Sequence, residues 1–276
     1  MVGRLPALLA GHQRLMGDAF SVGRRRSAPR SGTARGMADM HLHSLYSDGT
    51  ASVAQILDHV EHRTSLDVIA ITDHERIDGA LRAAELHAAG DYSFDLVIGE
   101  EITTRSGHVL ALFVTERLAA LRPLAETLAA IHAQGGIAIA AHPLAPIPLR
   151  VGRRSLLRVR DDATPGVRFD AIELFNPSYA GRVRSRARTA LNARELHLPG
   201  VGNSDAHVLE GIGTGRTLFA GHTAADYRAA ILAGTVTPDG DAHWSSAHNV
   251  DVYRRQLHAK ARHLWHTIRP GDADWR

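Results

Sequence analysis

The chain has 276 residues, a formal net charge of +3 and a sequence pI of about 9.7. It contains no cysteine and a single lysine, Lys260, which excludes disulfides, thiolate nucleophiles, cysteine-bound zinc and lysine chemistry in the core. Histidine occurs 18 times, and imidazole is the commonest side-chain ligand for metal ions. Any bound metal would therefore be held by nitrogen and oxygen.

Residues 1–36 show neither a strand pattern nor a strong helix pattern. Their stretch SVGRRRSAPRSGTARG is too polar to bury the area that ordering requires. We expect a disordered leader or a start assigned too early, with Met37 as the true start. An arginine-rich, acid-poor leader is also typical of an organelle transit peptide. The piece LPALLAG is too short for a signal peptide or a membrane span, so we expect a cytoplasmic protein without a membrane anchor.

Residues 37–240 alternate between short apolar runs and helical patterns. Beyond a first run that ends in HLH, we predict buried strands at 67–72, 94–99, 108–114, 136–142, 169–175 and 198–204. Helical spacing is clear at 52–63, 122–135 and 180–196. This alternation predicts an α/β fold with a parallel sheet, closed or distorted into a barrel. Residues 241–276 lose the alternation, and we predict a basic helical tail there.

The predicted strands end in polar side chains that can bind metal ions. In chain order these are His41, His43 and Asp48, then Asp73 and His74, Glu100 and Glu101, His142, Glu173 and Asn176, and finally Asp205 and His207. The carboxyl ends of the strands in a parallel barrel meet at one face, so these groups should converge.

A lone histidine beside a strand is more often a structural, hydrogen-bonded group than a ligand. Burying so many histidines and acids together would be costly without a compensating charge. A multinuclear metal site explains them jointly. In HLH, the alternation of a strand sends both imidazoles to the same face, where they can hold one ion.

In this order and at these intervals, the motifs resemble those of the polymerase and histidinol phosphatase (PHP) family, and within it the small stand-alone phosphoesterases. The matching motifs are HxH and SDG (His41, His43, Asp48), TDH (His74), GxE (Glu101), AHP (His142) and SDxH (Asp205, His207). The resemblance covers about residues 37–235. It implies a distorted seven-stranded β/α barrel that holds two or three divalent ions.

The resemblance also implies a ligand set. The first ion would be held by His41, His43, Glu101 and Asp205, the second by Glu101 and His142, and the third by Asp48, His74 and His207. Glu101 is preferred to Glu100 because the family motif has one residue between the glycine and the acid. Glu173 is either a further ligand of the second ion or a structural group. A site without sulfur suits Mn²⁺, Fe²⁺ or Zn²⁺.

The predicted function is hydrolysis of a small phosphomonoester by a hydroxide that bridges two ions. Glu101, Asp205 and His207 are the expected catalytic groups. An arginine-rich segment from Arg150 to Arg188 suits an anionic substrate, although most of its arginines fit solvated helix faces. The candidates for substrate contact are Arg153, Arg154, Arg182, Asn176 and His108, and His108 fits a structural role as well. A nucleotide such as a nucleoside 3',5'-bisphosphate would suit this site.

Two alternatives remain open at this stage. The same metal centre could hydrolyse an amide or carbamate C–N bond. The chain could also be a nucleic-acid exonuclease or a non-catalytic module, but only 5% of its residues are aromatic, which disfavours an extended groove that stacks bases.

Overall fold

The computed structural model describes residues 21–22, 35–146, 150–241, 254–255 and 257–259. The strands are β1 (Ser21–Val22), β2 (Arg35–Leu42), β3 (Val68–Ile71), β4 (Asp95–Thr104), β5 (Gly107–Leu112), β6 (Ile137–Ala140), β7 (Ala171–Phe175), β8 (Gly200–Gly202), β9 (Gly215–Ala220) and β10 (Thr237–Gly240). The helices are α2 (Val53–Arg63), α3 (Asp78–Ala89), α4 (Leu124–Ala133), α5 (Arg153–Asp161), α6 (Tyr179–Arg182), α7 (Ser185–Leu191) and α8 (Ala224–Ala233), with a π-helix η1 (Asn192–Leu196) and a 3₁₀-helix η2 (Leu209–Gly211).

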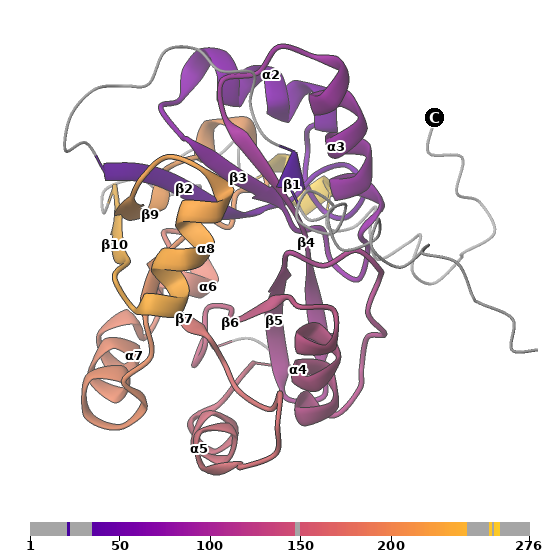
Figure 1. Ribbon diagram of the computed structural model, residues 1–276. Coiled ribbons are helices and arrows are strands. Elements are labelled where there is room, and N and C mark those ends of the chain that lie inside the picture. The colour runs from indigo at the N-terminus through magenta and orange to yellow at the C-terminus, as the bar shows by residue number, and fades with distance from the viewer. Residues whose placement is uncertain (1–20, 23–34, 147–149, 242–253, 256, 260–276) are drawn as a thin grey trace, which may run out of the picture.

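The strands form one curved sheet in the order β10-β9-β2-β3-β4-β5-β6-β7-β8, and β1 pairs with β4 off this path (Figure 1). Strands β2, β3 and β4 are parallel, as are β6, β7 and β8, whereas β5 runs antiparallel to both of its neighbours. Just after β8, Ala206 is bridged to Leu42 at the end of β2. The amide of His43 donates to the Ala206 carbonyl at 2.9 Å, which helps to close the sheet. The predicted distorted β/α barrel is therefore confirmed.

Helices α2, α3, α4, α5 and α7 pack against one face of the curved sheet, whereas α8 packs against the apolar layer of the other face through Tyr227 and Ile231. In Figure 1, α2 and α3 lie at the upper end, α4, α5 and α7 lie at the lower end, and α8 lies in front of β9. One apolar layer, which includes Ile56 and Leu128, fills the space between sheet and helices, and a second, with Met40 and Phe113, lines the other face of the sheet. Among the described residues, no helix is both long and apolar enough to cross a bilayer.

Local sequence explains several of these elements. Strands β3 (VIAI) and β6 (IAIA) are buried at every residue, as expected for parallel strands covered on both faces. Helix α2 begins at a capping box, in which Ser52 and Gln55 satisfy each other's backbone amides. The pairing of β2 with β3 shifts register between Asp39 and Leu42, an irregularity that lies beside His41. Such irregularities re-aim side chains and are frequent next to functional sites.

The seven predicted strands are present as β2 to β8. Strands β1, β9 and β10 were not predicted. Strand β1 has only two residues, and β10 (TPDG) lacks apolar alternation. The helix predicted at 180–196 is divided into α6, α7 and η1, since Arg184 adopts a left-handed backbone with φ of 63°. Within the predicted leader, Ser21–Val22 pair with β4 and β2 starts at Arg35; residues 1–20 and 23–34 lie outside the described part. Most of the predicted C-terminal tail also lies outside it.

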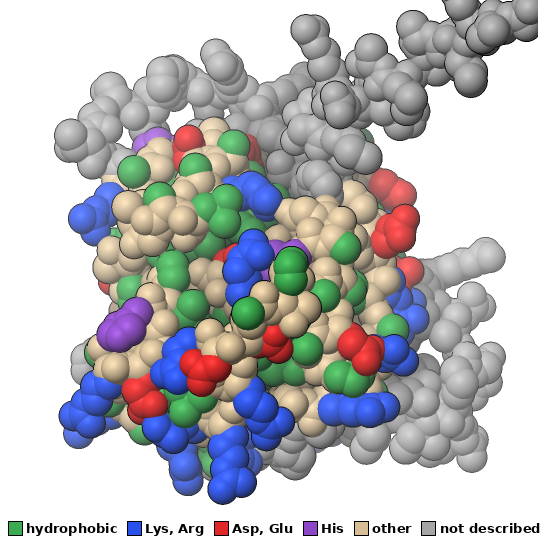
Figure 2. Space-filling model, turned by 60° about the horizontal axis from the view of Figure 1, so that its bottom comes forward, with side chains coloured by type: hydrophobic (Ala, Val, Ile, Leu, Met, Phe, Trp, Pro, Cys, Tyr) green, Lys and Arg blue, Asp and Glu red, His purple; other side chains and the backbone are tan. Residues whose placement is uncertain are grey.

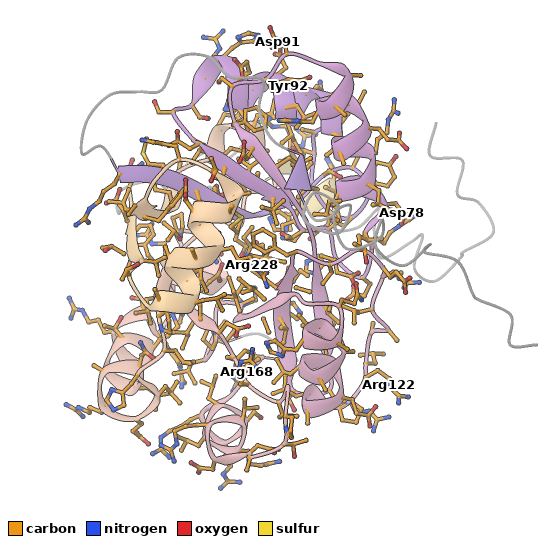
Figure 3. The ribbon with its side chains drawn as sticks, in the orientation of Figure 1. Asp78, Asp91, Tyr92, Arg122, Arg168 and Arg228 are labelled. Carbon is orange, nitrogen blue, oxygen red and sulfur yellow. The ribbon has the colours of Figure 1, made fainter. Side chains whose placement is uncertain are left out.

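An ion pair on the side of the barrel predicts a pH-dependent stability. His132 on α4 places Nε2 2.8 Å from Asp170 Oδ2, and its Nδ1 donates to the Gly166 carbonyl at 2.7 Å. Arg168, labelled in Figure 3, donates to the other oxygen of Asp170. The hydrogen bond that the imidazole donates to Asp170 raises the pKa of His132 above its ordinary value of 6.5. The protonated imidazole therefore stabilises the fold, fully below pH 6.5, and this contribution is lost as pH rises through the raised pKa.

We expect His132→Gln to lower the free energy of unfolding more at pH 6 than at pH 9. Urea denaturation in the presence of a chelator measures this difference without interference from metal ions. His62→Gln is the control, because His62 pairs with Asp58 on an exposed helix face and such pairs contribute little. An equal loss of stability at both pH values would show that the pair contributes no pH dependence.

Candidate metal centre

The polar groups predicted at the strand ends converge at the barrel end where the parallel strands finish. Groups of His, Asp and Glu whose ligand atoms lie within 4.8 Å of one another are His43, Asp48, His74 and His207; His41, His43 and Asp205; His41, Glu101 and His142; and His74, Glu101 and His108. All eight residues predicted as metal ligands belong to one or more of these groups. All are buried except His74, whose side chain is 17% exposed. His108, in the last of these groups, is also partly exposed at 16%, so the site is nearly closed and two imidazoles reach the outside.

Glu101 lies at the centre of the site. Its Oε2 is 3.1 Å from His41 Nε2, 3.2 Å from His74 Nδ1 and 3.4 Å from His43 Nε2. Its other oxygen, Oε1, is 2.9 Å from His108 Nδ1 and 3.1 Å from His142 Nε2.

The two oxygens of Glu101 therefore face different sets of imidazoles. This arrangement suits a carboxylate that bridges two ions. The surrounding charges of His74, His41 and His108 outweigh the effect of burial and hold the pKa of Glu101 well below its ordinary value.

Glu100 faces away from this cluster, because successive side chains of a strand point to opposite faces. Its Oε1 accepts a hydrogen bond from the Leu118 amide at 2.6 Å, and burial raises its pKa to about 7. Of the two adjacent acids, the structure brings only Glu101 to the histidines.

Asp48 and Asp205 supply the other carboxylates. Asp48 Oδ2 lies 3.0 Å from His207 Nε2, and Asp205 Oδ1 lies 3.2 Å from His43 Nε2. The His43 ring stacks between those of His74 and His207, with centroids 4.7 and 4.2 Å apart. His43 therefore stands between the ligand group of Asp48 and that of Asp205.

The donor set fits divalent cations. Three carboxylates, those of Asp205, Glu101 and Glu173, outweigh burial and raise the pKa of His41 well above its ordinary value. This indicates a local excess of negative charge. Burial and the His207 imidazole lower the pKa of His43 to about 3. Neither ring nitrogen of His43 has a hydrogen-bond partner of good geometry among the described residues, so a neutral imidazole is left to bind a cation.

Glu173 lies behind His41 instead of among the ligand groups. Its Oε1 is 2.9 Å from His41 Nδ1 and accepts from Asn203 Nδ2 at 2.8 Å. Its Oε2 accepts from the His142 amide at 2.6 Å and from Asn176 Nδ2 at 3.1 Å. A carboxylate in this position fixes the tautomer of a metal-binding histidine, so that Nε2 of His41 faces Glu101 and Asp205.

Asp73, one of the strand-end acids that the sequence offered for metal binding, belongs to none of the ligand groups among the described residues and instead holds the loop after β2. Asp73 accepts from the Ser44 amide at 2.7 Å and from the hydroxyls of Ser44 and Ser47 at 2.6 and 2.5 Å. A Cβ on Gly49 would lie 2.2 Å from the His43 carbonyl oxygen, so only glycine fits after Asp48. The SxxSDG pattern contains part of this signal, since its two serines supply hydroxyl donors beside Asp48 and its glycine permits the close approach.

Two of the predicted ligands have an uncommon backbone conformation. His142 has φ of 26° and Asp205 has φ of 54°, both in the left-handed region that favours glycine. Ser178 Oγ donates to Asp205 Oδ2 at 2.8 Å, and Glu173 accepts from the His142 amide. Strained residues of this kind persist where the surrounding structure holds them, and they cluster at functional sites.

The predicted substrate residues are placed differently from one another. Asn176 donates to Glu173 and lies inside the site. Arg153 is 58% exposed and pairs with Glu195 on η1 at 2.6 Å. Arg154 lines a shallow surface groove with Arg158 and two aspartates.

Arg182 is exposed on α6, one turn after Ser178. Of the three predicted arginines it has the most direct link to the metal site, since Ser178 bonds to Asp205. On the face in Figure 2, a histidine side chain reaches the surface beside a basic side chain near the centre, and further basic groups gather along the lower edge.

Comparison with known proteins supports these observations. A family model described as PHP-associated matches residues 184–236. The uncharacterized protein MJ1587 of Methanocaldococcus jannaschii is 32% identical over 150 residues, which make up 50% of this chain and 81% of that protein. Among solved structures, a two-domain protein from Bacteroides vulgatus with a predicted PHP-like metal-dependent phosphoesterase has a TM-score of 0.60 at 18% identity, covering 86% of this chain and 75% of that one. An amidohydrolase from Chromobacterium violaceum, with bound sulfate and no metal, has a TM-score of 0.51 at 16% identity, and the match covers 75% of this chain and 99% of that one.

Proposed function

This chain belongs to the PHP family, and from that premise we propose that it is a metal-dependent phosphoesterase that hydrolyses a small phosphomonoester. The observation that carries the proposal is the position of Glu101, whose two oxygens face separate groups of imidazoles. Such a carboxylate suits adjacent divalent ions. When bound, a pair of ions would lower the pKa of an attacking water, orient it and neutralise charge on the displaced oxygen.

The ligand groups suggest how the ions are distributed. The first ion would be held by His41, His43, Asp205 and Glu101, the second by Glu101, His142 and His108, and the third by Asp48, His74 and His207. His108 replaces Glu173 as the further ligand of the second ion, because it faces the same oxygen of Glu101 as His142 does. Nitrogen and oxygen donors suit Mn²⁺, Fe²⁺ or Zn²⁺.

His207 suits a ligand role better than proton transfer. Its Nδ1 lies 3.0 Å from the Asp205 carbonyl oxygen, and its Nε2 lies 3.0 Å from Asp48. The carbonyl accepts the Nδ1 proton and leaves the Nε2 lone pair toward the cluster. His207 would thereby be oriented by the backbone of Asp205, itself a proposed ligand.

Arg182 would bind the phosphate of the substrate. A guanidinium binds phosphate through two parallel hydrogen bonds. The amide of Arg182 donates to the carbonyl of Ser178, whose hydroxyl donates to Asp205, so this arginine is linked to the site through Ser178. Replacement by Ala is expected to lower kcat/KM about 10- to 100-fold, the usual cost of losing a charged hydrogen bond. Arg153→Ala is the control, since Arg153 is paired with Glu195. The assignment fails if both variants lose the same activity toward phosphomonoesters.

The function itself is tested by phosphate release. The protein would be reconstituted with Mn²⁺ and assayed on a panel of phosphomonoesters that includes nucleoside 3',5'-bisphosphates. We expect release from a few substrates, abolished by a chelator and restored by the metal. If ions are bound and none of the substrates releases phosphate, the proposal is wrong.

A second candidate, hydrolysis of an amide or carbamate bond, is favoured by the ligand set itself, because histidine and carboxylate ligands also suit C–N bond hydrolysis. The likeness in fold to an amidohydrolase agrees with this. None of the described residues is a lysine that could bridge two ions; Lys260, the only lysine of the sequence, lies outside the described part of the chain. Release of amine instead of phosphate from a matched panel would favour this candidate.

A further inference from the structure

One arginine of the basic segment is completely buried. Arg188 on α7 has an exposed fraction of 0%, whereas Arg182, Arg184 and Arg186 are exposed. Arginine is almost never fully buried unless it is paired. No carboxylate contacts the Arg188 guanidinium among the described residues, which makes its position costly and calls for a functional reason.

The Arg188 guanidinium donates to three backbone carbonyls. Nη1 donates to the Pro143 carbonyl at 3.2 Å, and Nη2 donates to those of Leu174 at 3.3 Å and Gly181 at 2.7 Å. Burial lowers the pKa of Arg188, and the negative charge of Glu173 opposes this effect. An arginine stays protonated in any protein environment, so the charge persists.

Each of the three carbonyls belongs to a residue that is adjacent in sequence to a residue of the metal site or of the proposed phosphate site. Pro143 follows His142, Leu174 follows Glu173, and Gly181 precedes Arg182. These residues are the second-ion ligand, the acid behind His41, and the proposed phosphate-binding group. One buried side chain therefore joins the three separate segments that carry them.

The backbone at His142 shows why such a support is needed. Its φ of 26° is unfavourable for a residue with a side chain. The His142 amide donates to Glu173, and the carbonyl of the following residue, Pro143, accepts from Arg188. The strained residue is thus fixed at both ends, and its ring is kept against Glu101.

We propose that Arg188 is a positioning residue of the metal centre, which sets His142 for the second ion and the α6 turn for the substrate. This inference rests on the proposed function for its substrate part, whereas its metal part concerns the ligand geometry alone. Arg188 touches neither the ions nor the substrate. Its removal should therefore weaken the metal site without deleting a ligand.

The test compares Arg188→Met and Arg188→Lys with two controls. Arg186→Met removes an exposed arginine from the same helix, and Leu156→Ala destabilises the fold from a buried position on α5. Titration with Mn²⁺ in the absence of substrate gives the affinity for each ion, and thermal unfolding gives the stability. We expect Arg188→Met to weaken the second ion about 10- to 100-fold, as loss of groups that orient ligands usually does. Arg188→Lys, with fewer donors, should restore part of this affinity.

His142→Ala completes a double-mutant cycle. If Arg188 acts through His142, Arg188→Met should weaken Mn²⁺ binding much less in the His142→Ala background than in the wild type. Unchanged Mn²⁺ affinity in Arg188→Met, with a loss of stability like that of Leu156→Ala, would overturn the proposal. If Arg188→Met does not fold, the same comparison is made with Arg188→Lys. Weakened Mn²⁺ binding in a protein that releases no phosphate would leave the inference intact and reject the proposed function.

Discussion

Glu101→Gln is expected to lower turnover by about 1,000-fold or more. Losses of this size are usual when one member of a set of groups that act together in catalysis is removed. Glutamine keeps the shape of the side chain but loses its charge and one acceptor oxygen. Because Glu101 faces imidazoles with both oxygens, two of the three proposed ions should bind more weakly. Metal content after dialysis and phosphate release measure the two effects separately.

Glu100→Gln is a matched control at the adjacent position. Glu100 is also fully buried, but it faces the Leu118 amide, and its pKa of about 7 means that it is largely protonated in slightly acidic solution. An amide resembles a protonated carboxyl group, so this variant should keep its ions and its turnover. The assignment of Glu101 would be contradicted if the two variants behaved alike.

His43→Ala should lower both the bound metal and the turnover by orders of magnitude. His43 belongs to two ligand groups, one with Asp48 and one with Asp205, and its ring stacks between two other imidazoles. Its low pKa keeps it neutral and able to bind a cation throughout the neutral range. Metal analysis should therefore show loss of more than one ion per chain, and activity should fall with it.

His87→Ala separates the loss of a ligand from the loss of a buried histidine. His87 is 3% exposed and bonds to the Phe94 carbonyl on the helical side of the sheet. Its replacement should cost stability while leaving the metal content unchanged. If His43→Ala kept the wild-type turnover although its first ion was lost, the proposed ligand assignment would be wrong.

Much of the site could be predicted from sequence, because strand ends in a parallel barrel share one face. The rule placed His41, His43, His74 and His142 together without any structure. Strand alternation shows only that Glu100 and Glu101 face opposite sides, and the choice of Glu101 came from its resemblance to the GxE motif.

The position of His108 was harder to predict. His108 lies near the amino end of β5, whereas the other candidates follow the carboxyl ends of their strands. It still reaches the site because β5 pairs antiparallel with β4. In the hairpin it lies opposite Thr103, on the same face as Glu101. This pairing could have been inferred had an antiparallel hairpin been considered instead of a uniform parallel sheet.

The arginines show a different limit. Sequence spacing alone does not distinguish buried Arg188 from exposed Arg186, because helix α7 is interrupted by Arg184 on one side and a π-helix on the other. The phase of a helix is lost at such interruptions. Proximity to a strand end also does not reveal that Arg153, on α5, pairs with Glu195.

The closure of the barrel between Leu42 and Ala206 has a consequence for how the protein matures. His41 and His43 come from the first strand of the closed series, and Asp205 and His207 follow its last parallel strand. An ion held by His41, His43 and Asp205 would tie together segments separated by more than half of the chain, as a crosslink does, and oppose the entropy of opening so long a loop. A growing chain on the ribosome would lack one of the four proposed ligands of the first ion until Asp205 had emerged, so the complete site would form only late in folding.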